Sequence, residues 1–307
     1  MKPGRIVIAG ASGFIGRALV RELAENGHEV VALTRNAEAA RARLPEGVQA
    51  AEWDGRTAAD WRRHVDGALA IVNLVGDNLA RGRWTRAKKE RIVSSRALPG
   101  AALVQAVREA GTKPLAFVQA SAVGFYGNPG EAEIDESSPP GAGFLAGVVR
   151  QWEGSTRDVE AHGVRRVVTR SGLVLGRSGG SFPTLVRPFR FLVGGPLGGG
   201  RQWFSWISLE DEVRAIRLLI GRRELSGPFD LTAPEPVRQK DLCRIIGKAM
   251  RRPCWFPVPA ALLRLLFGEK AEQVLLVSQR VLPRRLVRAG FEFRHPDAAS
   301  AVSAILR

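Results

Sequence analysis

The sequence predicts an α/β protein, in which a doubly wound, mostly parallel sheet is followed by a smaller and mainly helical C-terminal lobe. Three observations support this prediction. Short apolar runs alternate with longer helical patterns in the first half of the chain, a glycine-rich turn follows the first run, and glycine and proline become frequent after about residue 176. Such alternation is typical of βαβ units, in which a helix connects two parallel strands.

Five apolar runs are expected to form strands, because each is short and is bounded by turn residues. They are residues 6–9, 30–33, 68–74, 116–120 and 166–175. The helical patterns of the first half cover residues 16–26, 84–110 and 148–162. Further on we expect a helix at 209–220, a strand at 228–232 and then mainly helices. We therefore assign residues 1–175 to one domain and residues 176–307 to a partly interleaved second lobe.

Composition narrows the class of protein. With 45% apolar residues in 307, the chain can bury a sizeable core. It has no apolar run long enough for a membrane span and no signal-peptide pattern, so we expect no membrane partner. Two isolated cysteines, Cys243 and Cys254, favour a reducing cytoplasm. The four histidines are widely separated, and we expect no metal site.

A net charge of +16 raises the question of a nucleic-acid partner. The 46 basic residues are scattered along the chain, however, and only seven of them are lysine. We therefore interpret most of them as solvated side chains and do not expect nucleic acid to bind. Attraction of phosphorylated ligands is the alternative that remains.

The first strand leads into a turn with three regularly spaced glycines, Gly10, Gly13 and Gly16. The first glycine permits a tight turn, the second lets backbone N–H groups approach a pyrophosphate, and the third allows the helix to pack closely on the strand. The start of the helix then offers free N–H donors and a partial positive charge. The sequence therefore predicts a dinucleotide-binding Rossmann domain.

The end of the second strand distinguishes the two pyridine dinucleotides. An NAD-binding domain usually has an acidic residue there, which binds the ribose 2′-hydroxyl. Here the strand ends in Thr34 and Arg35, and the nearby acid, Glu29, lies at the other end of the strand. A guanidinium can bind a 2′-phosphate through two hydrogen bonds and stack on adenine. NADP(H) is therefore favoured over NAD(H).

Several further motifs accompany the glycine turn. They are residues 53–54, 73–76, 121–127, 170–176, 194–203, 206–211 and 282–293. With these motifs the chain resembles the short-chain dehydrogenase/reductase superfamily, and more closely its extended, nucleotide-sugar-epimerase-like branch. Within that branch it resembles an atypical NAD(P)-dependent epimerase-like family of undefined substrate. That family has its own small C-terminal domain, to which residues 258–307 correspond.

The resemblance implies a role for each matching position. The pyrophosphate would contact Gly10, Ser12, Gly13, Phe14, Ile15 and Gly16. The adenosine side would contact Thr34, Arg35 and Asp54. The ribose–nicotinamide half would lie against Leu74, Val75, Gly76, Ser121, Ala122, Ser171, Gly172 and Val174.

The superfamily's proton transfer relies on a Tyr-x-x-x-Lys pair, which this chain lacks. Its only tyrosine is Tyr126, and residue 130 is glycine. Counted back from Tyr126, the position of the superfamily's usual catalytic hydroxyl is Ala122 rather than Ser121. If the protein is an oxidoreductase or epimerase, Tyr126 and Ser121 are the nearest proton-handling candidates and Glu153 is a more distant one. A tyrosine with its usual pKa of about 10 is a poor base at neutral pH. The alternative is a catalytically silent NADP(H)-binding regulatory protein.

A glycine-rich segment, residues 194–206, is the candidate contact for a small or nucleotide-linked substrate. Its aromatic and amide side chains, Gln202, Trp203 and Trp206, suit a flat ligand. The alternative is that the tryptophans pack between the lobes. The leucine-rich segment 262–267 is expected to pack in the core, and it also offers an apolar face for a homodimer.

Overall fold

A computed structural model describes residues 2–79 and 82–307. Its centre is a seven-stranded sheet in the order β11-β7-β5-β4-β1-β2-β3, in which all paired strands are parallel. The strands are β1 (Arg5–Ala9), β2 (Glu29–Thr34), β3 (Gln49–Glu52), β4 (Ala70–Asn73), β5 (Ala116–Ala122), β7 (Arg165–Ser171) and β11 (Gly227–Leu231). This order, which runs outwards in both directions from β1 and β4, is the predicted doubly wound Rossmann topology.

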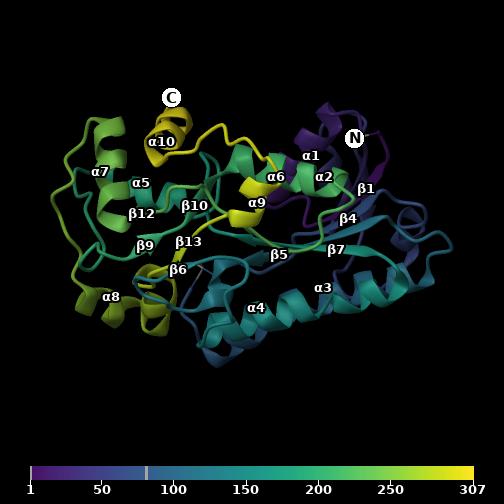
Figure 1. Ribbon diagram of the computed structural model, residues 1–307, viewed down its shortest axis with the longest axis horizontal. Helices are drawn as coiled ribbons and strands as arrows, with labels where there is room; N and C mark the ends of the chain where they lie inside the picture. Colours follow the sequence, from purple (N-terminus) through teal and green to yellow (C-terminus); the bar gives the residue numbers. More distant parts are fainter. Residues whose placement is uncertain (1, 80–81) are drawn as a thin grey trace.

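Helices cover both faces of the sheet (Figure 1). One face carries α1 (Phe14–Glu25) and α6 (Leu209–Gly221), and the other carries α3 (Arg86–Glu109) and α4 (Phe144–Gly154). Alternate residues of a strand face opposite layers, so Ile6 and Ile8 belong to the core under α1, whereas Val7 belongs to the core under α3. Because both faces of the sheet are buried, most of its strands contain a short apolar run, which is why sequence pattern alone located most of them.

The remaining elements of the first half are short. They are α2 (Ala37–Arg41), η1 (Asp60–His64), η2 (Val123–Tyr126), β6 (Glu133–Ile134), η3 (Arg157–His162) and β8 (Leu173–Leu175). The C-terminal half adds α5 (Phe182–Arg190), β9 (Trp203–Phe204), β10 (Trp206–Ser208), β12 (Val237–Arg238), α7 (Gln239–Met250), α8 (Ala260–Phe267), η4 (Ala271–Leu275), β13 (Arg280–Val281), α9 (Arg284–Arg288) and α10 (Ala298–Leu306).

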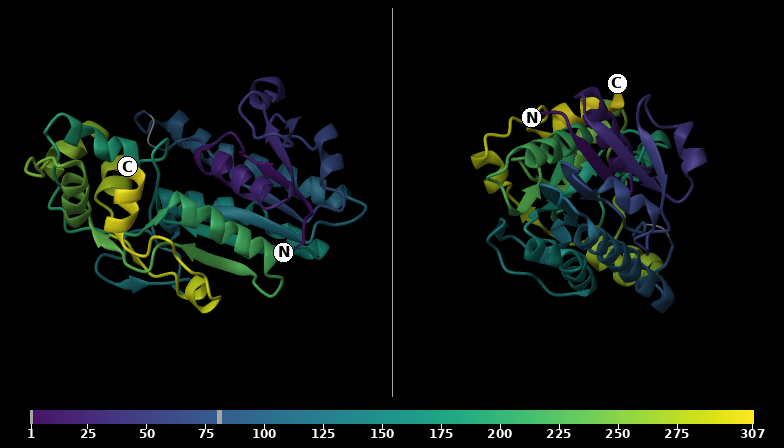
Figure 2. Two further views of the ribbon diagram at one scale, coloured as in Figure 1. Left: turned by 90° about the horizontal axis from the view of Figure 1, so that it is seen from above. Right: turned by 90° about the vertical axis from the view of Figure 1, so that its right-hand side faces the viewer.

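Small strand pairs connect the two halves of the chain. β10 pairs with β8, and β13 pairs with β6, so segments far apart in sequence lie side by side. The C-terminal lobe has its own core, in which α5, α7 and α10 bury Phe182, Leu242 and Val302. Figure 2 shows this lobe at one end of the molecule, with α10 beside α7. No helix of the described part of the chain is long and apolar enough to span a membrane.

Three details differ from the sequence prediction. The apolar run 166–175 forms two strands, because the chain bends at Gly172, where a Cβ atom would lie 2.6 Å from the carbonyl oxygen of Ser205. The helix predicted at 148–162 begins at Phe144 and ends at Gly154. The edge strand β3 was not predicted, since its sequence, QAAE, has little apolar character. The strand predicted at 228–232 is observed as β11, which comes from the second half of the chain and belongs to the main sheet.

Candidate functional site

The glycine turn between β1 and α1 has the geometry of a phosphate-binding loop. Gly10 has φ +85°, and a Cβ atom on it would lie 2.9 Å from the carbonyl carbon of Leu74. A Cβ on Gly16 would lie 2.2 Å from the carbonyl oxygen of Gly10. No side chain caps α1, and its first turn has no acidic residue. Its N–H groups are therefore available to an anion.

A cavity of about 490 Å³ opens beside this turn. Nine of the predicted cofactor residues line it: Gly10, Ser12, Gly13, Thr34, Arg35, Asp54, Leu74, Val75 and Gly76. They come from the ends of β1, β2 and β4 and from the loop after β3, which meet at the carboxyl edge of the parallel sheet. The structure therefore brings together the residues assigned to the pyrophosphate and adenosine parts of the cofactor.

Phe14 and Ile15 lie beside this cavity without lining it. The Phe14 ring lies so close to Gly176, Gly179 and Gly180 that a Cβ on any of the three would approach it to within 2.5–2.9 Å. Ile15 packs against the core under α1. Their side chains thus anchor the start of α1 to the loop after β8, and only their backbone atoms remain for a phosphate.

The cavity lining also includes a cation, Arg35. Arg35 is exposed and forms no side-chain hydrogen bond or ion pair within residues 2–79 and 82–307. Asp54, in contrast, accepts hydrogen bonds from the backbone of Arg56 and from both the backbone and the hydroxyl of Thr57. These bonds lower the pKa of Asp54. Asp54 therefore shapes the loop, while Arg35 is free to meet a phosphate.

One wall of the cavity was missed by sequence reasoning. It is formed by α3, which contributes Arg91, Ser94, Ser95, Leu98 and Pro99. The first four are spaced i, i+3, i+4 and i+7, so they share one helix face. That spacing was visible in the sequence, but nothing in it showed that this face would turn towards the glycine loop.

Two buried cations of α3, Lys88 and Arg96, hold this helix against the loop after β4. Nζ of Lys88 donates to Asp77 at 2.7 Å, which lowers the pKa of that carboxyl. Arg96 donates to the backbone oxygens of Ile92 and Asp77, and burial lowers its pKa to about 10. A Cβ on Gly76 would lie 3.0 Å from the Arg96 guanidinium. These contacts fix the loop after β4 against α3.

The side chain of Tyr126 is buried and is held by hydrogen bonds to two other buried side chains. Its hydroxyl donates to the carboxylate of Asp230 at 2.9 Å and accepts from Arg170 at 3.0 Å. The Tyr126 side chain is only 4% exposed, and Asp230 is fully buried. Burial, followed by the neighbouring Asp230, raises the pKa of Tyr126 above its usual value. The hydroxyl therefore keeps its proton and is already bonded on both sides, which argues against the proton-transfer role assigned to it from sequence.

Ser121 is likewise committed to a buried network. Its hydroxyl donates to Oε1 of Glu153 at 2.5 Å, and the guanidinium of Arg170 binds both oxygens of the same carboxylate. The three side chains connect β5, α4 and β7. Glu153, the most distant catalytic candidate, is thus an ion-pair partner of Arg170. This network explains why a carboxylate lies at the end of an otherwise apolar helix face.

The positions where a Tyr-x-x-x-Lys pair would lie on α4 are apolar. Depending on the register, they are Phe144 and Val148 or Leu145 and Val149. Val148 and Val149 are buried, and Val149 packs against a small cluster that includes Tyr126. Described side chains near these positions supply no tyrosine–lysine pair in their place.

A buried acid, Glu212, lies beside Ser171, one of the residues that the resemblance assigns to the nicotinamide half of the cofactor. Ser171, at the end of β7, is the registered neighbour of Ala122 on β5. Its hydroxyl donates to Oε1 of Glu212 on α6 at 2.6 Å. Glu212 is 1% exposed, and its second oxygen has no hydrogen-bond partner within the part of the chain described. Burial raises the pKa of Glu212 to about 8, so the carboxyl retains a proton at neutral pH.

The predicted substrate residues pack between the lobes. Trp206 is fully buried, and its indole N–H donates to the backbone oxygen of Glu235. The Gln202 amide donates to the backbone oxygens of Leu197 and Leu275. Trp203 is half-buried and donates to Glu131, with the guanidinium of Arg238 3.9 Å from its ring centroid. These contacts match the packing alternative, and only Trp203 keeps part of its surface open.

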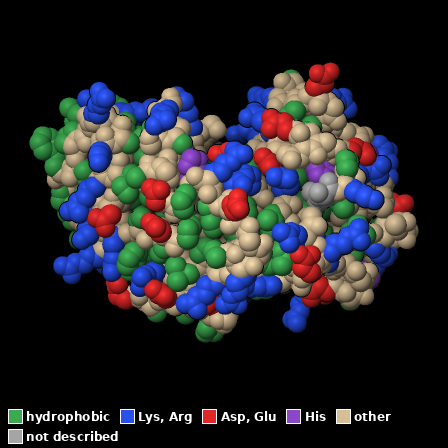
Figure 3. Space-filling model, turned by 45° about the horizontal axis from the view of Figure 1, so that its top comes forward, with side chains coloured by type: hydrophobic (Ala, Val, Ile, Leu, Met, Phe, Trp, Pro, Cys, Tyr) green, Lys and Arg blue, Asp and Glu red, His purple; other side chains and the backbone are tan. Residues whose placement is uncertain are grey.

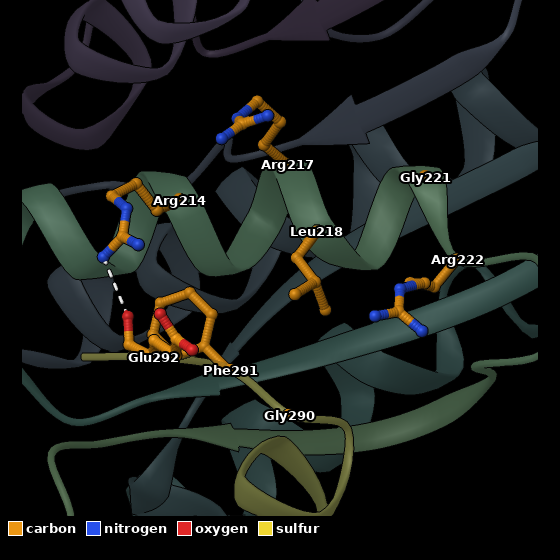
Figure 4. A pocket seen from close by; sticks show the side chains of 8 residues that line it. All are labelled: Arg214, Arg217, Leu218, Gly221, Arg222, Gly290, Phe291 and Glu292. Atoms are coloured by element: carbon orange, nitrogen blue, oxygen red, sulfur yellow. Dashed lines mark hydrogen bonds between the residues drawn. The ribbon is translucent and has the colours of Figure 1, made fainter. Parts of the chain in front are cut away.

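A second hollow, of about 320 Å³, lies between α6 and the segment 290–292 (Figure 4). Three arginines line it, and each has a carboxylate partner: Arg214 with Asp211, Arg217 with Glu22, and Arg222 with Glu224. Figure 4 also shows Arg214 donating to the backbone oxygen of Glu292. Because these charges are compensated, the hollow has little unpaired charge to offer an anion.

Basic residues elsewhere are spread among acidic ones, as Figure 3 shows for one face of the molecule. Nineteen salt bridges connect residues of the described chain, and most of them use arginine. This distribution agrees with the interpretation of the net charge as dispersed, solvated side chains.

Comparison with known proteins identifies the family to which the chain belongs. Residues 6–229 match the NAD dependent epimerase/dehydratase family, and residues 258–305 match a domain of unknown function, DUF1731. An epimerase family protein of Mycobacterium leprae is 40% identical over 97% of this chain and 94% of its own length. The Arabidopsis thaliana epimerase family protein SDR39U1 homolog, described as chloroplastic, is 37% identical over 98% of this chain and 86% of its own.

Solved structures agree with these matches. The human epimerase family protein SDR39U1, crystallised with NADPH, superposes with a TM-score of 0.88 at 31% identity, covering 98% of this chain and 99% of its own. UDP-glucose 4-epimerase of Thermus thermophilus, in complex with NAD, has a TM-score of 0.76 at 19% identity, covering 98% and 97%, and it supports the fold alone. The resemblance found in the sequence is thus confirmed, and the chain belongs to the NAD dependent epimerase/dehydratase family, with a DUF1731 domain at its C-terminus.

Proposed function

We propose that this protein binds NADP(H) and uses it as an oxidoreductase or epimerase-like enzyme on a small or nucleotide-linked substrate. The observation that carries the proposal is the 490 Å³ cavity, whose lining includes both the uncapped start of α1 and Arg35, which has no ion pair among the described residues. A diphosphate and a ribose phosphate both suit these groups. The human relative crystallised with NADPH supports the same choice of cofactor.

A second part of the proposal concerns the proton. Bound NADPH would supply a hydride to a carbonyl carbon of the substrate. The Ser171 hydroxyl would give its proton to the carbonyl oxygen. The protonated Glu212, whose Oε1 lies 2.6 Å from the Ser171 hydroxyl, would return a proton to it, with this hydrogen bond reversed so that the carboxyl donates. A carboxyl that stays neutral near pH 7 because of burial can act in this way as an acid. Ser171 lies beside Ala122, the position that lacks the superfamily's hydroxyl.

The Glu212→Gln variant tests this proton route, because it keeps the shape of the side chain and removes its acidic proton. We expect NADPH oxidation, measured with a panel of carbonyl compounds and nucleotide-linked keto sugars, to fall at least tenfold, whereas the Kd for NADPH stays within about threefold. In the wild type, kcat/KM should decline as the pH rises through about 8, where Glu212 loses its proton. Tyr126→Phe is the control and should retain most activity. An unchanged pH profile in Glu212→Gln would remove Glu212 from the mechanism.

One observation favours a second candidate, a catalytically silent NADP(H)-binding regulatory protein. The positions of the usual catalytic side chains are occupied by Ala122 and by apolar residues of α4, while Tyr126 is bonded within the core. If NADPH binds but no panel compound is turned over, and Glu212→Gln alters neither binding nor stability, this second candidate is the better account.

A further inference from the structure

Exposed apolar side chains gather in the C-terminal lobe. Twelve large hydrophobic side chains are exposed among the described residues, and nine of them lie between residues 191 and 267 of this lobe. Five belong to two adjoining loops, which we call the apolar edge: Phe191, Leu192, Val193, Trp255 and Phe256. The other four follow shortly afterwards on α8. Trp255 is 70% exposed and Phe191 is 67% exposed, so the two rings extend into solvent.

The two loops of the apolar edge are joined by their backbones. The indole N–H of Trp255 donates to the backbone oxygen of Leu192 at 2.9 Å. The backbone N–H groups of Trp255 and Phe256 both donate to the oxygen of Gly194 at 3.1 Å. Leu192 has φ +61°, a conformation that is unfavourable for a side chain of its size. The surrounding hydrogen bonds hold it there, so the loops present their apolar groups in a fixed arrangement.

Unpaired cations accompany these side chains. Residues 181–193 and 244–259 contain six lysines and arginines and no aspartate or glutamate. Five of the six are exposed and form no ion pair within the described ranges: Arg187, Arg190, Lys248, Arg251 and Arg252. Figure 3 shows hydrophobic and basic side chains next to one another at the left end of the molecule, over this lobe. Among the described salt bridges, only that between Arg244 and Asp241 involves these two segments.

We propose that the apolar edge and these five cations dock on the surface of a bilayer that contains anionic phospholipid. Aromatic rings insert at the level of the headgroups, and nearby lysines and arginines are attracted to the negative surface. A second copy placed symmetrically on the same edge would bring two sets of like charges together, which disfavours self-association there. From the sequence we expected no membrane partner, but that expectation rested on the lack of a spanning segment and of a signal peptide and did not concern binding to the bilayer surface.

Vesicle co-sedimentation tests the proposal. The full chain is mixed with vesicles made of phosphatidylcholine alone or of phosphatidylcholine with about 30% phosphatidylglycerol. The second kind has the negative surface of an anionic membrane. We expect at least tenfold more bound protein on the anionic vesicles, decreasing as salt is raised. The emission of the exposed Trp255 should shift to shorter wavelength on binding, and Trp255→Phe should abolish the shift while it retains binding.

Matched variants separate the two contributions. Trp255→Ser/Phe256→Ser and Arg251→Gln/Arg252→Gln should each reduce binding to anionic vesicles about tenfold or more. Leu115→Ser and Val287→Ser, which change exposed apolar residues on other surfaces, should leave binding unchanged. All of these variants should bind NADPH as the wild type does, since no residue of the apolar edge lines the cofactor cavity.

Three results would overturn the proposal. The wild type would fail to sediment with anionic vesicles, or the edge variants would bind as well as the wild type. Alternatively, the wild type would be a dimer in solution by light scattering and Trp255→Ser/Phe256→Ser would convert it to a folded monomer, which would show that a second copy covers the edge.

Discussion

Arginine side chains in this protein differ according to whether a carboxylate faces them. Arg170 is buried, and its guanidinium is shared between Glu153 and Tyr126, so its charge serves to connect β7 with α4. Arg35 is exposed at the end of β2 with no such partner in the described chain. The first arrangement is structural and the second leaves a cation free for a ligand.

We expect Arg35→Asp to weaken the binding of NADPH by about 10- to 100-fold, because charge-assisted hydrogen bonds to a phosphate are each worth roughly 1.5–3 kcal/mol. NADH has no 2′-phosphate, so its affinity should change by no more than about threefold. Isothermal titration of both dinucleotides provides the measurement. Arg41→Asp, the same charge change on an exposed residue of α2, is the control. An equal loss for both dinucleotides would contradict the preference for NADP(H).

At the scale of elements, the contact between β1 and α1 determines whether the cofactor can be held. Gly16 lies so close to Gly10 and Ala11 that an added Cβ would contact backbone atoms at 2.2–2.9 Å. Backbone atoms cannot give way as a flexible side chain can. The start of the helix, and with it the N–H groups facing the cavity, depends on this close approach.

The Gly16→Ala variant should therefore lose about 1–3 kcal/mol of unfolding free energy through overpacking, together with most NADPH affinity. Gly147→Ala provides the control, since it lies within α4 and a Cβ there meets nothing within 4 Å. Because alanine has a higher helix propensity than glycine, Gly147→Ala should leave the unfolding free energy unchanged or raise it by up to about 1 kcal/mol. Urea unfolding measures both changes, and equal stability of the two variants would show that the turn tolerates a side chain.

Elements also show where sequence patterns are reliable. The long helix predicted at 84–110 is observed as α3 despite the internal Pro99, because Pro99 and Gly100 are buried and Gly100 lies against Ser155. The helix predicted at 148–162 was placed too late, because no capping residue marks its start at Gly143 and its apolar face continues into η3. Periodicity identified both helices, but tertiary contacts determined their ends.

At the scale of the whole molecule, the C-terminal segment, residues 258–307, is joined to the rest of the chain by hydrogen bonds, strand pairing and core packing. The carboxylate of Asp211 on α6 accepts hydrogen bonds from the backbone of Arg294 and His295. β13 pairs with β6, and α10 buries Val302 against the core of α5 and α7. The segment that carries the unassigned domain thus packs against elements from both halves of the chain.

We expect a chain ending at residue 257 to have a melting temperature at least 10 °C lower than the full chain, because the deletion exposes apolar core surface and removes the two backbone N–H groups that donate to the buried Asp211. Circular dichroism during heating measures this. Val287→Ser, an exposed change within the deleted segment, should have little effect. A truncated chain with an unchanged melting temperature would show that residues 258–307 form a separate unit.

The sequence by itself determined the sheet class, the glycine turn, the cation at the end of β2 and the lack of a tyrosine–lysine pair. These features are local, since each depends on residue types at short spacing along one strand or turn. Only the tertiary structure showed that α3 forms a cavity wall, that Tyr126 and Ser121 are bonded within the interior, and that Glu212 lies beside Ser171. Those partners are 32 to 104 residues apart in the chain. Because burial and long-range hydrogen bonds decide what a polar side chain does, its residue type and sequence neighbours were insufficient.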